Sequence, residues 1–75
     1  MNLNDVKLNT RCIIKSINLS NEKTKIRLME LGFVEGSFVS VNRRSVLKKT
    51  LLIIFNDCCF TLKDNLAQEI VVDYA

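Results

Sequence analysis

The side chains with the greatest chemical reactivity in this chain belong to three cysteines, Cys12, Cys58 and Cys59. A thiolate is both a nucleophile and a metal ligand, so the neighbouring pair Cys58-Cys59 invites a redox or metal interpretation. Adjacent residues of a strand point to opposite faces, however, so the two sulfur atoms would diverge. Zinc and iron–sulfur sites take four ligands, and the chain has neither histidine nor a Cys-x-x-Cys spacing. We predict Cys12 and Cys58 as structural residues, Cys59 as the exposed one, and no metal site.

The absence of histidine also bears on catalysis, because histidine is the usual general base. Without a base to activate a cysteine, a thiol enzyme is the weakest functional class. The chain has no P-loop spacing, so it would not hold a nucleotide by that mechanism. We expect no catalytic residue and no cofactor, and a domain that acts by binding a partner.

A basic group surrounds the loop 45–49 and consists of Arg43, Arg44, Lys48 and Lys49. Such a group could bind nucleic acid, anionic lipid or an acidic partner, in a chain of net charge +3. RNA-binding domains usually add exposed aromatic residues for stacking, and this chain has only four phenylalanines and one tyrosine. A solvated loop without a specific role is favoured, followed by a protein partner and then by nucleic acid.

The elements that must position these residues are short, because 75 residues form one domain with a thin core. The alternation over 11–19 predicts a strand. Helical spacing of apolar residues then predicts a helix over about 21–31, with Ser20 or Asn21 as its N-cap and with Leu28 and Leu31 in its core stripe. Gly32 follows where a left-handed residue ends a helix, and Gly36 lies in the next tight connection.

Two further strands, at 37–43 and 50–55, lead to the most informative turn, Asn56-Asp57. A two-residue hairpin there pairs Phe55 with Cys58, Ile53 with Phe60 and Leu51 with Leu62. Because side chains alternate along a strand, these six residues share one face, which we predict as core. The opposite face carries Leu52, Ile54, Cys59 and Thr61, and it is unusually apolar for an outer surface.

A short helical turn near 64–68 and a last strand over 68–74 complete the chain. The inventory is about five strands and one α-helix, which predicts a mainly β fold, a small SH3-like β-barrel formed by 1–75 as a single domain. No apolar run is long enough to span a membrane, and the first residues lack the apolar core of a signal peptide. With an odd cysteine count, these features predict a cytoplasmic protein.

The order of elements and several residues resemble the FeoA family of small accessory proteins of bacterial ferrous iron uptake. The segment 27–33, Arg-Leu-Met-Glu-Leu-Gly-Phe, is similar to the helix-end motif of that family. Gly36, the strand residues Val39 and Val41, the pair Leu62-Lys63, and then Ala67 and Ile70 also match. The resemblance covers the chain from about Leu3 to Val72.

Four departures from the family pattern concern the partner surface. Glu35 stands where relatives usually have proline, the loop 45–49 lacks their prolines, and Asn56-Asp57 replaces the hairpin glycine. Relatives tend to carry polar residues on the outer face, where this chain has Ile54 and Cys59.

The resemblance implies a non-catalytic accessory protein that binds the cytosolic part of the membrane transporter FeoB. The candidate partner-binding residues are Met29, Phe33, Arg43, Arg44, Leu52 and Ile54. If the chain supplied an arginine to a neighbour's nucleotide site, Arg27, Arg43 or Arg44 would be the residue to test. The Leu52 and Ile54 face could also support weak self-association.

Two alternatives remain at this point. One is a small RNA-binding barrel, although we do not expect nucleic acid as the partner. The other is a stand-alone relative of the SH3-like domain of iron-dependent repressors. Such a domain could not act as a repressor alone, because the chain lacks a DNA-reading helix pair.

Overall fold

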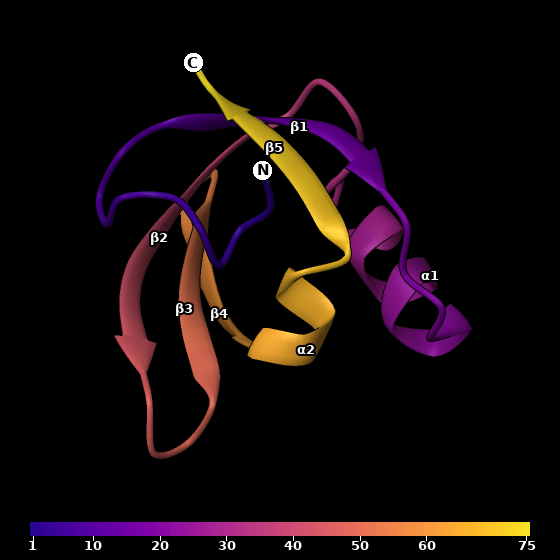
Figure 1. Ribbon diagram of the computed structural model, residues 1–75. Helices are drawn as coiled ribbons and strands as arrows, with labels where there is room; N and C mark the ends of the chain where they lie inside the picture. The colour runs from indigo at the N-terminus through magenta and orange to yellow at the C-terminus, as the bar shows by residue number, and fades with distance from the viewer.

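Five strands and two helices make up the computed structural model, which describes residues 1–75 (Figure 1). In chain order they are β1 (Cys12–Ile17), α1 (Glu22–Glu30), β2 (Phe38–Ser45), β3 (Thr50–Phe55), β4 (Cys58–Lys63), α2 (Asp64–Ala67) and β5 (Ile70–Tyr74). The mainly β prediction is confirmed, and each expected element is present within a few residues of its predicted bounds.

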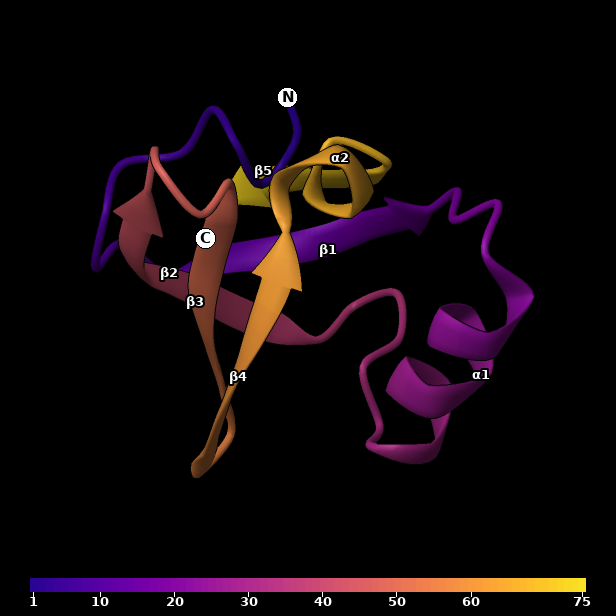
Figure 2. The same cartoon turned by 90° about the horizontal axis from the view of Figure 1, so that it is seen from below.

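The strands form one antiparallel sheet in the order β4-β3-β2-β1-β5. β2 joins the two halves of the sheet. Its residues Phe38 and Val39 pair with β1, and its residues from Ser40 onward pair with β3. Register shifts in the β1–β5 pair and in the β2–β3 pair bend the sheet. The sheet therefore curls around its own core, as Figure 2 shows from below. β4 and β5 are its terminal strands, and the N-terminal segment pairs with β5 through an Asn2–Val71 bridge.

The β3–β4 hairpin has the predicted register, with Phe55 opposite Cys58 and Leu51 opposite Leu62. Asn56 takes a left-handed conformation with φ of 55°, which asparagine tolerates better than most residues. Four of the six residues of the predicted core face are buried, and Phe60 is half-buried. Cys58, at the end of the hairpin (Figure 2), is exposed, not buried as we expected. Its partner Phe55 is buried, because that larger side chain packs against Phe33.

Helix α1 begins and ends as its sequence predicts. The Asn21 side chain accepts a hydrogen bond of 3.1 Å from the Thr24 backbone N–H, and Gly32 follows the helix with φ of 88°. The helix buries only Leu28, however. Leu31, expected in the core stripe, is half exposed, because α1 packs on the body along one narrow line of its surface. Neither helix is long and apolar enough to cross a membrane.

The core contains sixteen buried apolar residues and no buried polar residue. Phe33 lies at its centre, fully buried, with its ring at an edge-to-face angle to Phe55 (5.2 Å) and to Phe60 (5.9 Å). The N-terminal segment contributes Leu3 and Val6, which the strand analysis did not assign to the core. That segment lies along β5, where the Val72 N–H donates to the Met1 carbonyl at 2.8 Å.

Candidate functional site

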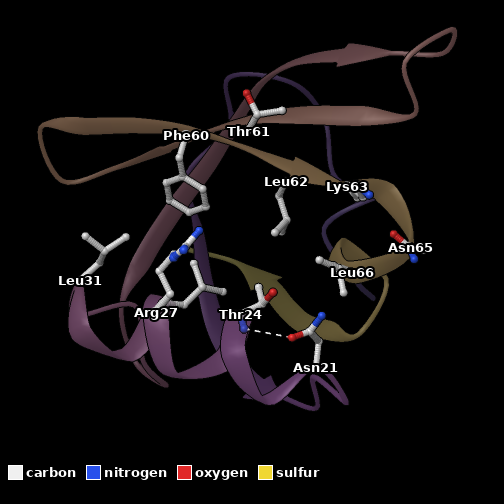
Figure 3. Close-up of a pocket in the computed structure, with 11 residues that line it drawn as sticks. Asn21, Thr24, Arg27, Leu31, Phe60, Thr61, Leu62, Lys63, Asn65 and Leu66 are labelled. Atoms are coloured by element: carbon white, nitrogen blue, oxygen red, sulfur yellow. Dashed lines mark hydrogen bonds between the residues drawn. The ribbon is translucent and has the colours of Figure 1, made fainter.

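A groove of about 440 Å³ separates α1 from β4 and α2 (Figure 3). Its floor is apolar and includes the buried residues Leu28 and Leu62. Eleven residues line it in all: Asn21, Thr24, Arg27, Leu28, Leu31, Phe60, Thr61, Leu62, Lys63, Asn65 and Leu66. We call this feature the α1–β4 groove.

The α1–β4 groove exists because Leu28 is the only residue of α1 that is buried against the body. Arg27 and Leu31 consequently remain exposed on the helix side, and Figure 3 shows the Arg27 side chain extending toward the Phe60 ring. On the opposite side Leu62 and Leu66 point into the hollow (Figure 3). Phe60 is half-buried at the rim, because Phe33 covers only part of its ring.

The charge of the groove has one sign. Arg27 and Lys63 are its only charged residues, and both are exposed. β4 lies at the end of the sheet, so no other strand pairs with its outer edge. A groove with an apolar floor, two cations and a free strand edge suits a peptide segment with an apolar anchor and acidic neighbours.

The predicted partner-binding residues near the helix do not form one surface. Met29 is half exposed and lies in a separate hollow with Ile17 and Val34. Phe33 is fully buried, so our placement of it on a partner surface was wrong. The chain turns inward at Phe33 because the left-handed Gly32 reverses its direction, and the Phe33 N–H donates to the Leu28 carbonyl at 2.9 Å.

The two arginines of β2 have different environments. Arg43 is exposed, whereas Arg44 is half-buried and its guanidinium donates to the backbone carbonyls of Leu3 (3.4 Å) and Val6. Arg44 therefore ties the N-terminal segment to β2. These hydrogen bonds give Arg44 a structural role and limit the surface that its side chain can offer to a partner.

Leu52 and Ile54 are half-buried on the outer face of β3. They lie in two different shallow hollows, Leu52 beside Arg43 and Ile54 beside Phe38. The outer face of β3 therefore does not offer Leu52 and Ile54 as one continuous apolar surface. Of the predicted site residues, the structure brings together only Arg43 and Leu52.

Comparison with known proteins assigns the family. A family model described as the FeoA domain matches residues 1–74, almost the whole chain. The chain belongs to the FeoA family. No curated protein matches it.

Solved FeoA structures resemble this FeoA-family chain over nearly its full length. The solution structure of FeoA from Chlorobium tepidum has a TM-score of 0.87 and 28% identity, and it is matched over 99% of this chain and 70% of that one. The crystal structure of Stenotrophomonas maltophilia FeoA complexed with zinc, described as a procaryotic SH3 domain protein, has a TM-score of 0.81 and 32% identity, over 97% and 89%. The SH3-like prediction is therefore confirmed.

A metal-dependent transcriptional regulator, MtsR, shares the fold. It has a TM-score of 0.80 and 16% identity, over 100% of this chain and 36% of that chain. At that identity the similarity concerns the fold alone. In this FeoA-family chain no three side chains of Cys, Asp or Glu come together.

The exposed aromatic rings of the chain are Phe38 and Tyr74. The Arg11 guanidinium lies 3.8 Å from the centre of the Phe38 ring and covers one face of it. The Tyr74 hydroxyl accepts a hydrogen bond from the Lys7 N–H, far along the chain from the basic group. Neither ring lines the basic hollow beside Arg43, so an RNA-binding surface is not favoured.

The three cysteines differ in exposure, which predicts their reactivity. Cys12 is buried, and burial raises the pKa of its thiol above the ordinary value, whereas Cys58 and Cys59 are exposed. In the folded protein at pH 8 we expect iodoacetamide to label Cys58 and Cys59 at least about tenfold faster than Cys12, because the thiolate is the reactive form. Peptide mass spectrometry after timed labelling measures this. Equal rates at all three sites would contradict the predicted burial.

Sequence reasoning did not identify the α1–β4 groove. Arg27 was named only as a candidate for a nucleotide site, and Leu31 was assigned to the core. The signal was present in α1, where Ile26, Met29 and Leu31 add apolar residues that one narrow contact cannot bury. Only the spacing between the helix and β4 shows which of them border a groove.

Proposed function

We propose that this protein is a non-catalytic cytosolic accessory protein of ferrous iron uptake, and that it binds the cytosolic part of a FeoB-type transporter through the α1–β4 groove. Membership of the FeoA family supports the role in ferrous iron transport. The observation that supports the groove is its composition: an apolar floor, a single sign of charge and a free strand edge.

The proposed contact has two parts with different physical roles. An apolar side chain of the partner enters between Leu31 and Phe60 and removes their exposed area from water. Arg27 and Lys63 attract acidic residues beside that anchor and set the orientation of the segment. No step in this function requires a bond to be made or broken.

The test is a titration of the isotope-labelled protein with the cytosolic domain of the FeoB transporter from the same organism. We expect amide shifts at residues of the α1–β4 groove and, for Leu31→Ser, an affinity at least about tenfold weaker, because truncation of a central apolar contact typically costs 1–2 kcal/mol or more. Calorimetry gives the affinities.

The matched control for this substitution is Ile26→Ser. Ile26 and Leu31 have nearly the same exposure, 52% and 51%, but only Leu31 lines the groove. Ile26→Ser should leave the affinity unchanged. Binding that survives Leu31→Ser and Arg27→Glu alike would place the partner elsewhere, and absence of binding in every nucleotide state would reject the transporter as the partner.

A further inference from the structure

The tip of the β2–β3 hairpin carries the two most exposed apolar residues of the protein. Val46 is 88% exposed and Leu47 is 98% exposed, whereas the other exposed large apolar residues lie between 43% and 52%. Figure 1 shows the hairpin extending past the rest of the chain at the lower left, with α1 apart from it at the right. Folding buries almost none of this apolar surface. The free energy gained by removing it from water is therefore available for binding a partner.

Hydrogen bonds around the tip hold it in this position. The Ser45 hydroxyl accepts from the Lys48 N–H at 3.2 Å, and the Lys49 carbonyl accepts from the Asp64 N–H at 2.9 Å. Lys49 has a φ of 54°, which turns the chain back into β3. At the base of the hairpin, Arg44 binds the N-terminal segment. The tip is thus held outward, with its two apolar side chains almost fully exposed.

A polar hollow of about 370 Å³ lies beside the tip. Arg43 and Lys48 supply two positive charges, and the hydroxyl-bearing residues Ser45, Thr50 and Thr61 line it with Leu52. No carboxylate lines this hollow. Asp64 lies on the other side of the hairpin with Lys49. Cations and hydroxyl donors without a competing carboxylate are the groups that bind a phosphate monoanion or diester.

We propose that the β2–β3 hairpin is a membrane-docking element: Val46 and Leu47 insert into the headgroup region of an anionic bilayer while a lipid phosphate occupies the hollow beside Arg43 and Lys48. The combination of an outward apolar tip with adjacent cations is the arrangement by which peripheral proteins bind such surfaces. No aromatic residue lines the hollow, so a nucleic-acid base finds no stacking partner there.

Two inserted side chains and a few cations bind weakly and reversibly. Their effect is to orient the molecule at the bilayer, with α1 lateral to the tip (Figure 1). The variants that test this element differ from those that test the α1–β4 groove, so either proposal can fail alone.

The first test uses Leu47→Trp as a reporter, because the chain contains no tryptophan. With phosphatidylglycerol vesicles we expect a blue shift of its fluorescence and quenching by brominated acyl chains. Phosphatidylcholine vesicles should give a much smaller response, because they lack net negative charge. A reporter that remains in water with anionic vesicles would overturn the proposal.

The second test compares vesicle sedimentation of matched variants. Val46→Ser with Leu47→Ser should weaken binding at least tenfold, and Arg43→Gln with Lys48→Gln about fivefold for each cation. The controls are Ile26→Ser and the pair Lys15→Gln with Lys23→Gln, which alter exposed residues of similar chemistry elsewhere and should bind like the unchanged protein.

Three results would overturn the proposal. One is unchanged vesicle binding by the tip variant, and another is an equal loss in the Lys15 and Lys23 control, which would indicate unspecific charge attraction. The third is occupation of the hollow by inorganic phosphate or by an RNA oligonucleotide, seen as amide shifts of Arg43 and Lys48, without binding to vesicles.

Discussion

Phe33→Ala should lower the free energy of unfolding by about 3–5 kcal/mol and leave a large fraction of the molecules unfolded. Phe33 is fully buried and joins the helix end to both strands of the β3–β4 hairpin through its contacts with Phe55 and Phe60. The total stability of a domain is only about 5–15 kcal/mol, and a short chain lies near the lower limit. Urea denaturation followed by circular dichroism measures the change.

The control for this prediction is Phe38→Ala. Phe38 is 46% exposed and contacts the Arg11 guanidinium, so its loss should cost no more than about 1 kcal/mol. A similar loss for both variants would show that the core is not centred on Phe33. The same comparison also decides whether Phe33 is structural, as its burial indicates, or part of a partner surface.

Arg44→Ala should lower the free energy of unfolding by about 2–3 kcal/mol. We expect this although Arg44 belongs to the basic group around a loop that the sequence predicts to be solvated. Its guanidinium donates to the carbonyls of Leu3 and Val6, both of which are buried. Removal of a charged donor leaves partly buried acceptors without a partner. We expect a lower urea midpoint and faster amide exchange at Asp5 and Asn9, whose N–H groups are bonded within this region.

The neighbouring residue provides the control for Arg44. Arg43→Ala removes the same side chain from an exposed position, and it should change stability by less than about 0.5 kcal/mol. Equal effects of the two substitutions would contradict the anchoring role. The two substitutions therefore distinguish the structural role of Arg44 from the surface position of Arg43, its neighbour in β2.

The element order and the register of the hairpin could be predicted because they depend on local patterns. Alternation placed Leu51, Ile53 and Leu62 on one face, and a two-residue turn then left a single pairing. Likewise, the N-cap at Asn21 and the left-handed Gly32 act within a few residues of themselves. Such short-range signals are present in the sequence whatever the rest of the chain does.

The site could not be predicted in the same way, because exposure depends on how far the core extends. Cys58 has the same facing as Leu62 and pairs with the buried Phe55, but the core covers only the larger Phe55 side chain there, and Cys58 is exposed. Leu31 has helical spacing from Leu28, but α1 touches the body along one narrow line, and Leu31 borders the α1–β4 groove instead.

By itself, the sequence determined the class of this protein: a small mainly β domain of the FeoA family, with the strand facing, turns and helix ends that follow from side-chain alternation and local hydrogen bonding. Only the tertiary structure decided which residues face a partner. Phe33, expected on a partner surface, is buried and Arg44 is half-buried, while Leu31, expected in the core, is half exposed. The physical reason is that a residue is buried only where segments distant in sequence cover it. Here the N-terminal segment covers Arg44 and the β3–β4 hairpin covers Phe33, and no local sequence pattern shows where such segments lie.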